Sequence, residues 1–203
     1  MIDIKNIGSK VGEEVTLQGW AYNMRSSGKL GFIQLRDGSG IIQAVVSKAD
    51  VSDESWNAVK EITIESAVMV KGIVKEDERS STGFELQATE VEMIQKAEEY
   101  PIGKKDHGPD FLLNNRHLWL RSSRQIAIQR IRGGIIKAIY DHLYEQGYIK
   151  FDSPILTPNA CEGTTTLFDI DYFDEKAYLS QSGQLYLEAG ALALGKVFDF
   201  GPV

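Results

Sequence analysis

The feature that most constrains the fold is a series of short segments, between residues 14 and 93, in which apolar and polar side chains alternate. Side chains of a β-strand point by turns to its two faces, so each such segment predicts a strand with one buried face. In residues 14–23 the predicted core face holds Val15, Leu17, Gly19 and Ala21, and the other face holds Thr16, Gln18, Trp20 and Tyr22. Further strands are predicted at 31–36, 41–46, 67–74 and 84–93, with turns at 26–29 and 37–40 and a helix at 53–62.

The order of these elements is β-β-β-α-β-β over about 95 residues. This order is typical of the five-stranded Greek-key barrel that binds oligonucleotides, the OB-fold. A β-sandwich topology remains an alternative.

One aromatic residue stands out in the second strand. Ile33 and Leu35 share the face that we assign to the core, which leaves Phe32 on the other face with Gln34 and Arg36. An exposed ring among cations is the combination that binds single-stranded nucleic acid, because the ring stacks on a base and the cations follow the phosphates.

Other polar side chains are expected around Phe32. Arg25 and Lys29 lie in the preceding turn, and Gln43 on the next strand can offer both a donor and an acceptor to a base edge. The alternative is that Phe32 packs against the linker or a neighbouring domain, and the pattern alone does not decide between the two.

Composition places the chain among ordinary globular proteins. Its 203 residues are 42% apolar and 25% charged, which excludes disordered and collagen-like classes. The net charge of −7 argues against a nucleic-acid partner. The charge is uneven, however, and residues 101–150 carry nine basic and four acidic side chains, so local basic surface is available. The charged run 76–79 is interpreted as a solvated loop.

The sequence gives no sign of a membrane span, a leader peptide or a metal site. No apolar run reaches the roughly 18 residues of a span, and the chain begins without a basic-then-apolar segment, so we expect a cytoplasmic protein with no membrane partner. The single cysteine, Cys161, excludes an intrachain disulfide and a multi-cysteine metal site. The three histidines are scattered, and no metal ligand is predicted.

A second domain is predicted after a linker. The first domain is expected at residues 1–98, a hinge rich in proline, glycine and mixed charge at 99–110, and the second domain at 111–203. A long helix is predicted from Ser122 or Ser123 to Glu145, with a serine as its N-cap. Its apolar stripe comprises Ile128, Ile131, Ile135, Ile139 and Leu143.

Two glycines, Gly133 and Gly134, lie in the middle of this helix, where each destabilises it by roughly 1 kcal/mol relative to alanine. We expect that they allow close packing against another backbone. A strand is predicted at 148–155, and the polar loop at 157–166 is of a kind that can close over a substrate.

Neutral hydrogen-bonding side chains gather near the end of the chain. A strand at 177–179 leads to Ser182 and Gln184, and a helical pattern begins at about Leu185. This arrangement predicts a small-molecule pocket.

The motifs resemble, in their order along nearly the whole chain, those of the class IIb aminoacyl-tRNA synthetases, and most closely the bacterial asparaginyl-tRNA synthetases. In the barrel the resemblance rests on Gly19-Trp20, Arg25, residues 32–38 and Gln43. In the second domain it rests on residues 113–118, 147–154, 161–163, 182–186 and 200–202.

The resemblance implies an α+β protein in which the OB-fold barrel binds the anticodon and is followed by the start of an antiparallel-sheet catalytic domain. It implies ATP-dependent ligation of asparagine to tRNA(Asn), with Mg²⁺, in a homodimer that does not bind DNA. Phe32 would stack on an anticodon base, and Arg25 and Gln43 would contact the anticodon. Pro154 would belong to the motif that builds the dimer interface.

In the amino-acid pocket, the resemblance implies that Glu162 meets the substrate ammonium from a mobile loop and that Ser182 and Gln184 line the site. Aspartyl relatives carry a lysine three residues after the pocket glutamine, whereas this chain has Leu187 and then Glu188 there. A neutral amide needs a donor and an acceptor but no cation, so asparagine fits better than aspartate, and Glu188 is a candidate acceptor for the amide nitrogen. The alternatives are a non-discriminating aspartyl-tRNA synthetase and a non-catalytic RNA-binding paralogue.

The family's later motifs, which supply ATP-binding arginines and acidic Mg²⁺ ligands, do not fall within the 203 residues. We therefore expect no catalytic residue and no bound cofactor in this segment, and no activation of asparagine by these residues alone. Unpaired strand edges would also make the second half the less stable part.

Overall fold

The computed structural model describes residues 2–80, 82–103, 105–158 and 167–201. The chain divides into two compact units, Met1–Gly108 and Pro109–Val203, which are described separately. In the described part, every helix is too short or too polar to cross a membrane.

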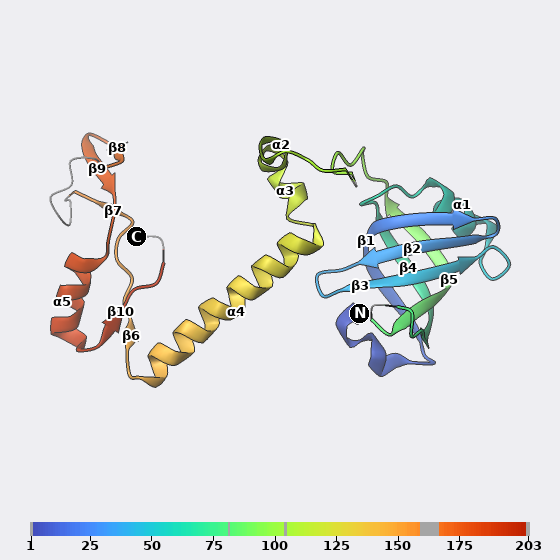
Figure 1. The fold of residues 1–203 in the computed structure, drawn as a ribbon, viewed down its shortest axis with the longest axis horizontal. Helices are drawn as coiled ribbons and strands as arrows, with labels where there is room; N and C mark the ends of the chain where they lie inside the picture. Colours follow the sequence, from blue (N-terminus) through green and yellow to red (C-terminus); the bar gives the residue numbers. More distant parts are fainter. Residues whose placement is uncertain (1, 81, 104, 159–166, 202–203) are drawn as a thin grey trace. The chain divides into compact units, whose positions relative to one another are not determined.

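The first unit is a closed five-stranded barrel (Figure 1). Its strands are β1 (Glu14–Ser27), β2 (Leu30–Arg36), β3 (Ile41–Ser47), β4 (Ala67–Glu76) and β5 (Phe84–Gln95), in the order β1-β2-β3-β5-β4. The β3–β5 pair is parallel, and pairing of β4 with β1 closes the barrel. The helix α1 (Asp53–Glu61) connects β3 to β4, and a 3₁₀ helix, η1 (Ile4–Lys10), precedes β1. The predicted Greek-key barrel is confirmed, and the sandwich alternative is excluded.

The alternating residues build the barrel core as predicted. Ile33 and Leu35 are fully buried, and Leu17 and Ala21 of β1 are buried with them. The helix α1 is capped by Ser52, whose hydroxyl accepts a hydrogen bond from the Ser55 amide at 3.1 Å. The core is therefore made from one face of each strand.

The first strand differs in length from the prediction. It continues four residues beyond 23, through a bulge between Ala21 and Asn23. Arg25 consequently lies on the strand rather than in the turn, directly across from Phe32 on β2. A bulge inserts an unpaired residue and bends the strand, which simple alternation does not foresee.

The second unit contains helices and short sheets. Its helices are α2 (Pro109–Asn114), α3 (Arg116–Trp119), α4 (Ser123–Glu145) and α5 (Gln184–Leu194). Its strands are β6 (Ile149–Lys150), β7 (Leu156–Thr157), β8 (Asp169–Tyr172), β9 (Glu175–Leu179) and β10 (Val197–Phe198). β6 pairs in parallel with β10, and β7, β9 and β8 form an antiparallel sheet. Together with the barrel, these elements make the α+β fold that was predicted.

One expectation for the second unit was wrong, and another is not met within this chain. The predicted strand at 148–155 shrinks to Ile149 and Lys150, because within the described chain only the two residues of β10 pair with it. Nothing in the described chain lies within 4 Å of a side-chain carbon built on Gly133 or Gly134, so the expected close backbone packing is absent there.

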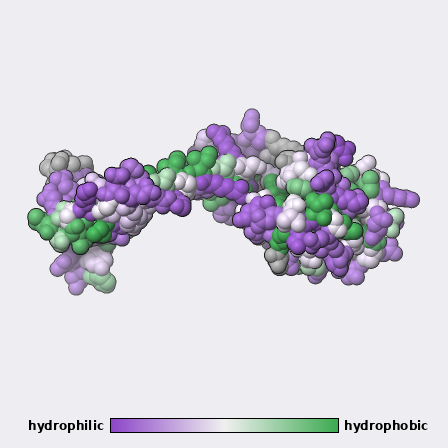
Figure 2. All heavy atoms as spheres, turned by 90° about the horizontal axis from the view of Figure 1, so that it is seen from below, coloured by the Kyte–Doolittle hydropathy of each residue, from purple (hydrophilic) through white to green (hydrophobic). Residues whose placement is uncertain are grey.

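The helix α4 exposes much of its apolar stripe. Ile131 is 63% exposed and Ile135 is 56% exposed. Figure 2 shows apolar side chains as green patches over α4 and near α5. Among the described hydrophobic residues of this unit, Phe198 alone is buried, so the unit has a small core.

Candidate functional site

The three residues predicted to contact an anticodon lie in one hollow on the barrel. Arg25 of β1, Phe32 of β2 and Gln43 of β3 line an open hollow of about 680 Å³. The other lining residues are Gln34, Ile41, Val45, Asp77, Arg79, Ser80 and Glu85. We call this set the barrel hollow.

The strand register explains why these side chains meet. Arg25 faces Phe32 across the β1–β2 pair, and its guanidinium carbon lies 4.4 Å from the centre of the ring. Gln43 faces Gln34 across the β2–β3 pair and Glu85 across the parallel β3–β5 pair. Neighbouring strands therefore present one aromatic, one cationic and two amide side chains on the same face.

Sequence reasoning missed Arg79 and Glu85 as members of the hollow. Arg79 lies between β4 and β5 in the run interpreted as a solvated loop, and it is indeed exposed. Its Nε donates to Asp77 Oδ1 at 3.0 Å, and this hydrogen bond holds the pKa of Asp77 below its usual range. Gln34 carried a signal in the sequence, because it shares the strand face of Phe32.

Two cations expected near Phe32 are not part of the hollow. Arg36 is buried, and its guanidinium donates to both carboxylate oxygens of Glu65, at 2.9 and 2.8 Å. Lys29 is not among the lining residues. Arg25 and Arg79 are therefore the cations that the barrel hollow offers to a phosphate.

This arrangement suits a single-stranded nucleic acid. A ring can stack on any base, guanidinium groups attract phosphates, and the Gln34 and Gln43 amides can each donate to and accept from a base edge. Asp77 and Glu85 add negative charge, which disfavours phosphate at that end and favours the amino groups of bases.

The second candidate site lies where β9 leads into α5. Ser182 Oγ accepts a hydrogen bond from the backbone N–H of Gln184 at 3.1 Å. The side-chain Nε2 of Gln184 donates to Glu188 Oε1, also at 3.1 Å. The structure thus brings together three of the predicted pocket residues. Glu162 lies outside the described residues, and Pro154 is exposed between β6 and β7.

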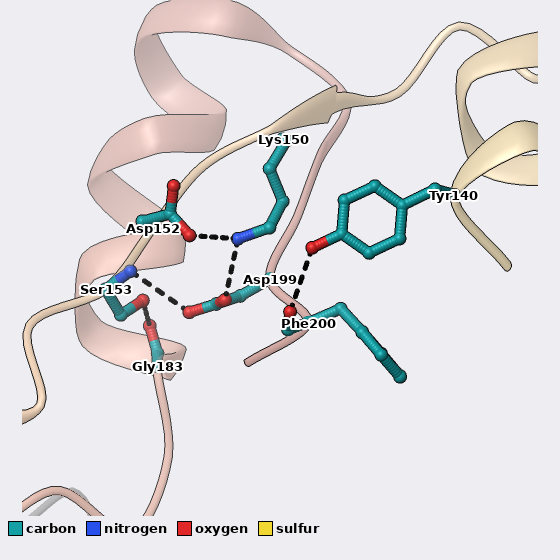
Figure 3. Close-up of polar contacts among 7 residues, drawn as sticks. All are labelled: Tyr140, Lys150, Asp152, Ser153, Gly183, Asp199 and Phe200. Atoms are coloured by element: carbon teal, nitrogen blue, oxygen red, sulfur yellow. Dashed lines mark hydrogen bonds and ion pairs between the residues drawn. The ribbon is translucent and has the colours of Figure 1, made fainter. Parts of the chain in front are cut away.

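A partly buried polar network contacts this turn (Figure 3). Asp199 Oδ2 accepts from the Ser153 amide at 3.1 Å, and Asp199 Oδ1 lies 3.2 Å from Lys150 Nζ, which also pairs with Asp152. The Ser153 hydroxyl donates to the carbonyl oxygen of Gly183 at 3.3 Å. Burial opposes the charge of Asp199, but hydrogen bonds from Ser153 and Lys150 outweigh it and lower the pKa of the carboxyl. Sequence reasoning did not assign this network.

Metal ligands are not evident in the described part of the chain, where no group of three or more His, Cys, Asp or Glu side chains could hold an ion. Residues that would bind Mg²⁺ are therefore not identified among those that the structure describes.

Comparison with known families matches each unit separately. Residues 15–94 match the OB-fold nucleic acid binding domain, and residues 108–203 match the class II tRNA synthetases (D, K and N). The barrel and the unit that follows it are thus those of a class II tRNA synthetase.

The similarity also extends along the whole chain. The chain is 53% identical to an asparagine–tRNA ligase of Streptococcus suis, covering all of this chain and 47% of that protein. Over its whole length the chain is therefore similar to the asparagine–tRNA ligases of this class. The chain spans about half the length of the curated relatives it matches.

Solved structures support the same assignment. The crystal structure of asparaginyl-tRNA synthetase from Pyrococcus horikoshii complexed with asparaginyl-adenylate is similar, with a TM-score of 0.88 and 41% identity, covering 95% of this chain and 45% of that one. The Entamoeba histolytica asparaginyl-tRNA synthetase in complex with asparaginyl-adenylate follows, with a TM-score of 0.79 and 31% identity, covering 93% and 44%. These relatives do not favour the aspartyl or the non-catalytic alternative.

Proposed function

We propose that the protein carrying this chain joins asparagine to tRNA(Asn) at the expense of ATP. The barrel hollow binds the anticodon, and the turn before α5 binds the amino acid. The observation that carries the choice of amino acid is the helix face formed by Gln184, Leu187 and Glu188, which presents an amide and a carboxylate but no cation.

Asparagine suits this face better than aspartate for an electrostatic reason. A carboxylate substrate needs a cation, whereas Leu187 is apolar and Glu188 would repel a second negative charge. A carboxamide needs both an acceptor and a donor. Glu188 and Ser182 supply acceptors, and Gln184 and Ser182 supply donors.

The reaction that the family relationship supports has two steps. The carboxylate of asparagine attacks the α-phosphorus of ATP, and pyrophosphate leaves as the adenylate forms. A hydroxyl of the terminal tRNA ribose then attacks the activated carbonyl, and AMP leaves. Mg²⁺, when bound, supplies positive charge against the phosphates. The described residues bind and orient the amino acid, and Glu162 is proposed to meet its ammonium group.

We also propose the domain limits and the assembly. Residues 1–98 form the anticodon-binding domain, 99–110 the hinge and 111–203 the first part of the catalytic domain, in a cytoplasmic homodimer. The exposed side chains of Ile131 and Ile135 on α4 and the exposed Pro154 support an interface with a second copy, because apolar patches of this kind mark interaction surfaces.

Anticodon binding can be tested on the 203-residue chain by fluorescence anisotropy. Labelled stem-loops carrying the asparagine anticodon and the aspartate anticodon differ in one base, and a third loop with an unrelated anticodon is the control. We expect the asparagine loop to bind at least about tenfold more tightly than the control, a difference of roughly 1.4 kcal/mol. Equal binding of all three loops would reject anticodon recognition by the barrel.

A further inference from the structure

Two segments that are far apart in the sequence meet at the carboxylate of Asp199 (Figure 3). Asp199 follows β10, and its side chain is 7% exposed. One oxygen accepts from the Ser153 amide, 46 residues away in the sequence, and the other pairs with Lys150 of β6. The carboxylate therefore links the end of β10 to the segment that follows β6.

A second link runs from Ser153 to the turn that carries the candidate pocket. The Ser153 hydroxyl donates to the carbonyl oxygen of Gly183, the residue immediately before α5. A side-chain carbon built on Gly183 would lie 2.4 Å from Ser153 Oγ and 2.9 Å from Asp199 Oδ2. The backbone of Gly183 thus rests directly on both side chains, and only glycine fits there without displacing them.

The position of Asp199 is itself fixed by α4. The Tyr140 hydroxyl donates to the carbonyl oxygen of Phe200 at 3.1 Å. The Tyr140 ring also contacts Phe198 and Phe200 edge-on, with centroid distances of 5.4 and 5.9 Å. The residues on both sides of Asp199 are therefore held by one aromatic side chain.

The charged side chains of this network are paired with opposite charges, because Lys150 contacts both Asp152 and Asp199. Lys150 lies between Asp152, which is 84% exposed, and the buried Asp199. The hydrogen bond to Asp152 contributes most to the raised pKa of Lys150, and the bonds from Ser153 and Lys150 keep the pKa of Asp199 low against the effect of burial. Both groups are consequently charged at neutral pH.

We propose that Asp199 is a positioning residue for the amino-acid site. Through Ser153 it fixes the Ser182–Gly183–Gln184 turn, and it thereby orients the side-chain amide of Gln184 toward the substrate. The role of Asp199 in positioning a substrate-binding group rests on the proposed function. Its effect on the conformation of the turn does not depend on that function.

The test uses amide NMR spectra of the ¹⁵N-labelled 203-residue chain, titrated with L-asparagine. Asp199→Asn removes the charge at the network, and Ser153→Ala removes the hydroxyl, which reaches Gly183 and also helps to lower the pKa of Asp199. Asp152→Asn is the matched control, because it deletes the other carboxylate on Lys150 without touching Ser153 or Gly183. Thermal unfolding of each variant checks that the second unit is folded.

We expect Asp199→Asn and Ser153→Ala each to raise the dissociation constant for asparagine at least tenfold, and Asp152→Asn to change it less than twofold. Since Asp199 acts through Ser153, the double variant Asp199→Asn/Ser153→Ala should bind no more than about twofold more weakly than the weaker single variant. Unchanged binding in Asp199→Asn, an equal loss in Asp152→Asn, or additive losses in the double variant would overturn the proposal.

The spectra without ligand separate this inference from the proposed function. If asparagine does not perturb the wild-type spectrum, asparagine binding by this turn fails. The positioning role then stands if Asp199→Asn moves the Gly183 and Gln184 amide signals while Asp152→Asn does not. It is overturned if the two amide signals stay in place.

Discussion

Replacement of Phe32 by alanine is the sharpest perturbation of the barrel hollow. The ring is half-buried and is contacted by the Arg25 guanidinium, so truncation removes both a stacking surface for a base and a cation–π partner. Stacking of one base on an aromatic side chain contributes about 1–3 kcal/mol. At about 1.4 kcal/mol for each factor of ten, the dissociation constant for the anticodon stem-loop should rise about 5- to 150-fold. Phe32→Leu should lose most of the same affinity, because leucine keeps the apolar contact but has no ring.

The assay is fluorescence anisotropy with the asparagine anticodon stem-loop, at one fixed salt concentration because phosphate contacts are salt-dependent. Trp20→Ala is the matched control: Trp20 is an exposed aromatic side chain on the same barrel, but it does not line the hollow. Phe32 does not belong to the buried core, so the unfolding midpoint should change little. The stacking role is refuted if Phe32→Ala binds within twofold of the wild type, or if Trp20→Ala weakens binding equally.

Two further predictions concern the stability of the barrel. Glu65→Ala leaves the buried Arg36 without its carboxylate partner and should lower the free energy of unfolding by about 3–5 kcal/mol. Glu14→Ala removes only an exposed pair with Lys71 and should lower the free energy of unfolding by less than about 1 kcal/mol. Similar losses for the two variants in denaturant unfolding would contradict this prediction. The pKa of Asp37 is lowered because hydrogen bonds from Ile4, Ser39 and Gly40 outweigh burial. The ionised Asp37 therefore stabilises the fold fully at a pH above its pKa in the unfolded chain, about 3.9, and this stabilisation is lost as the pH falls through its lower pKa in the folded chain. The difference in unfolding free energy between the wild type and Asp37→Asn should consequently shrink below about pH 4. A difference that is constant from pH 2 to 6 would exclude this role.

The barrel was predictable from the sequence because each strand buries one face. Apolar residues at alternate positions, such as Leu17, Ile33 and Leu35, identify that face. The observed limits of β2, β3, β4, β5 and α1 lie within two residues of the predicted limits. The bulge in β1 was not predictable, since it depends on pairing with β2 rather than on local pattern.

The candidate sites were predictable in part. Arg25, Phe32 and Gln43 meet because adjacent strands have short connections and fixed register. Glu85 joins them through the parallel β3–β5 pairing, and Arg79 joins them from the segment that connects β4 to β5. No local sequence feature indicates either contact.

The structure of the second unit differs more from the sequence-based predictions than the barrel does. Strand formation at 148–155 needs partner strands, and the described chain supplies only β10. The Asp199 network joins residues 30 to 49 positions apart, so neither periodicity nor a motif could indicate it. The Ser182, Gln184 and Glu188 cluster, by contrast, is local to the start of α5. The residue pattern indicated Ser182 and Gln184, and the comparison with aspartyl relatives indicated Glu188.

The most direct test of the proposed function is aminoacylation of tRNA by the protein that carries this chain, with radiolabelled asparagine or radiolabelled aspartate as the sole amino acid. Label from asparagine should become attached to tRNA(Asn) in the presence of ATP, and aspartate should give a rate at least about 100-fold lower, a difference of roughly 2.8 kcal/mol in transition-state stabilisation. Attachment of aspartate to tRNA(Asn) at a comparable rate would contradict the proposed function.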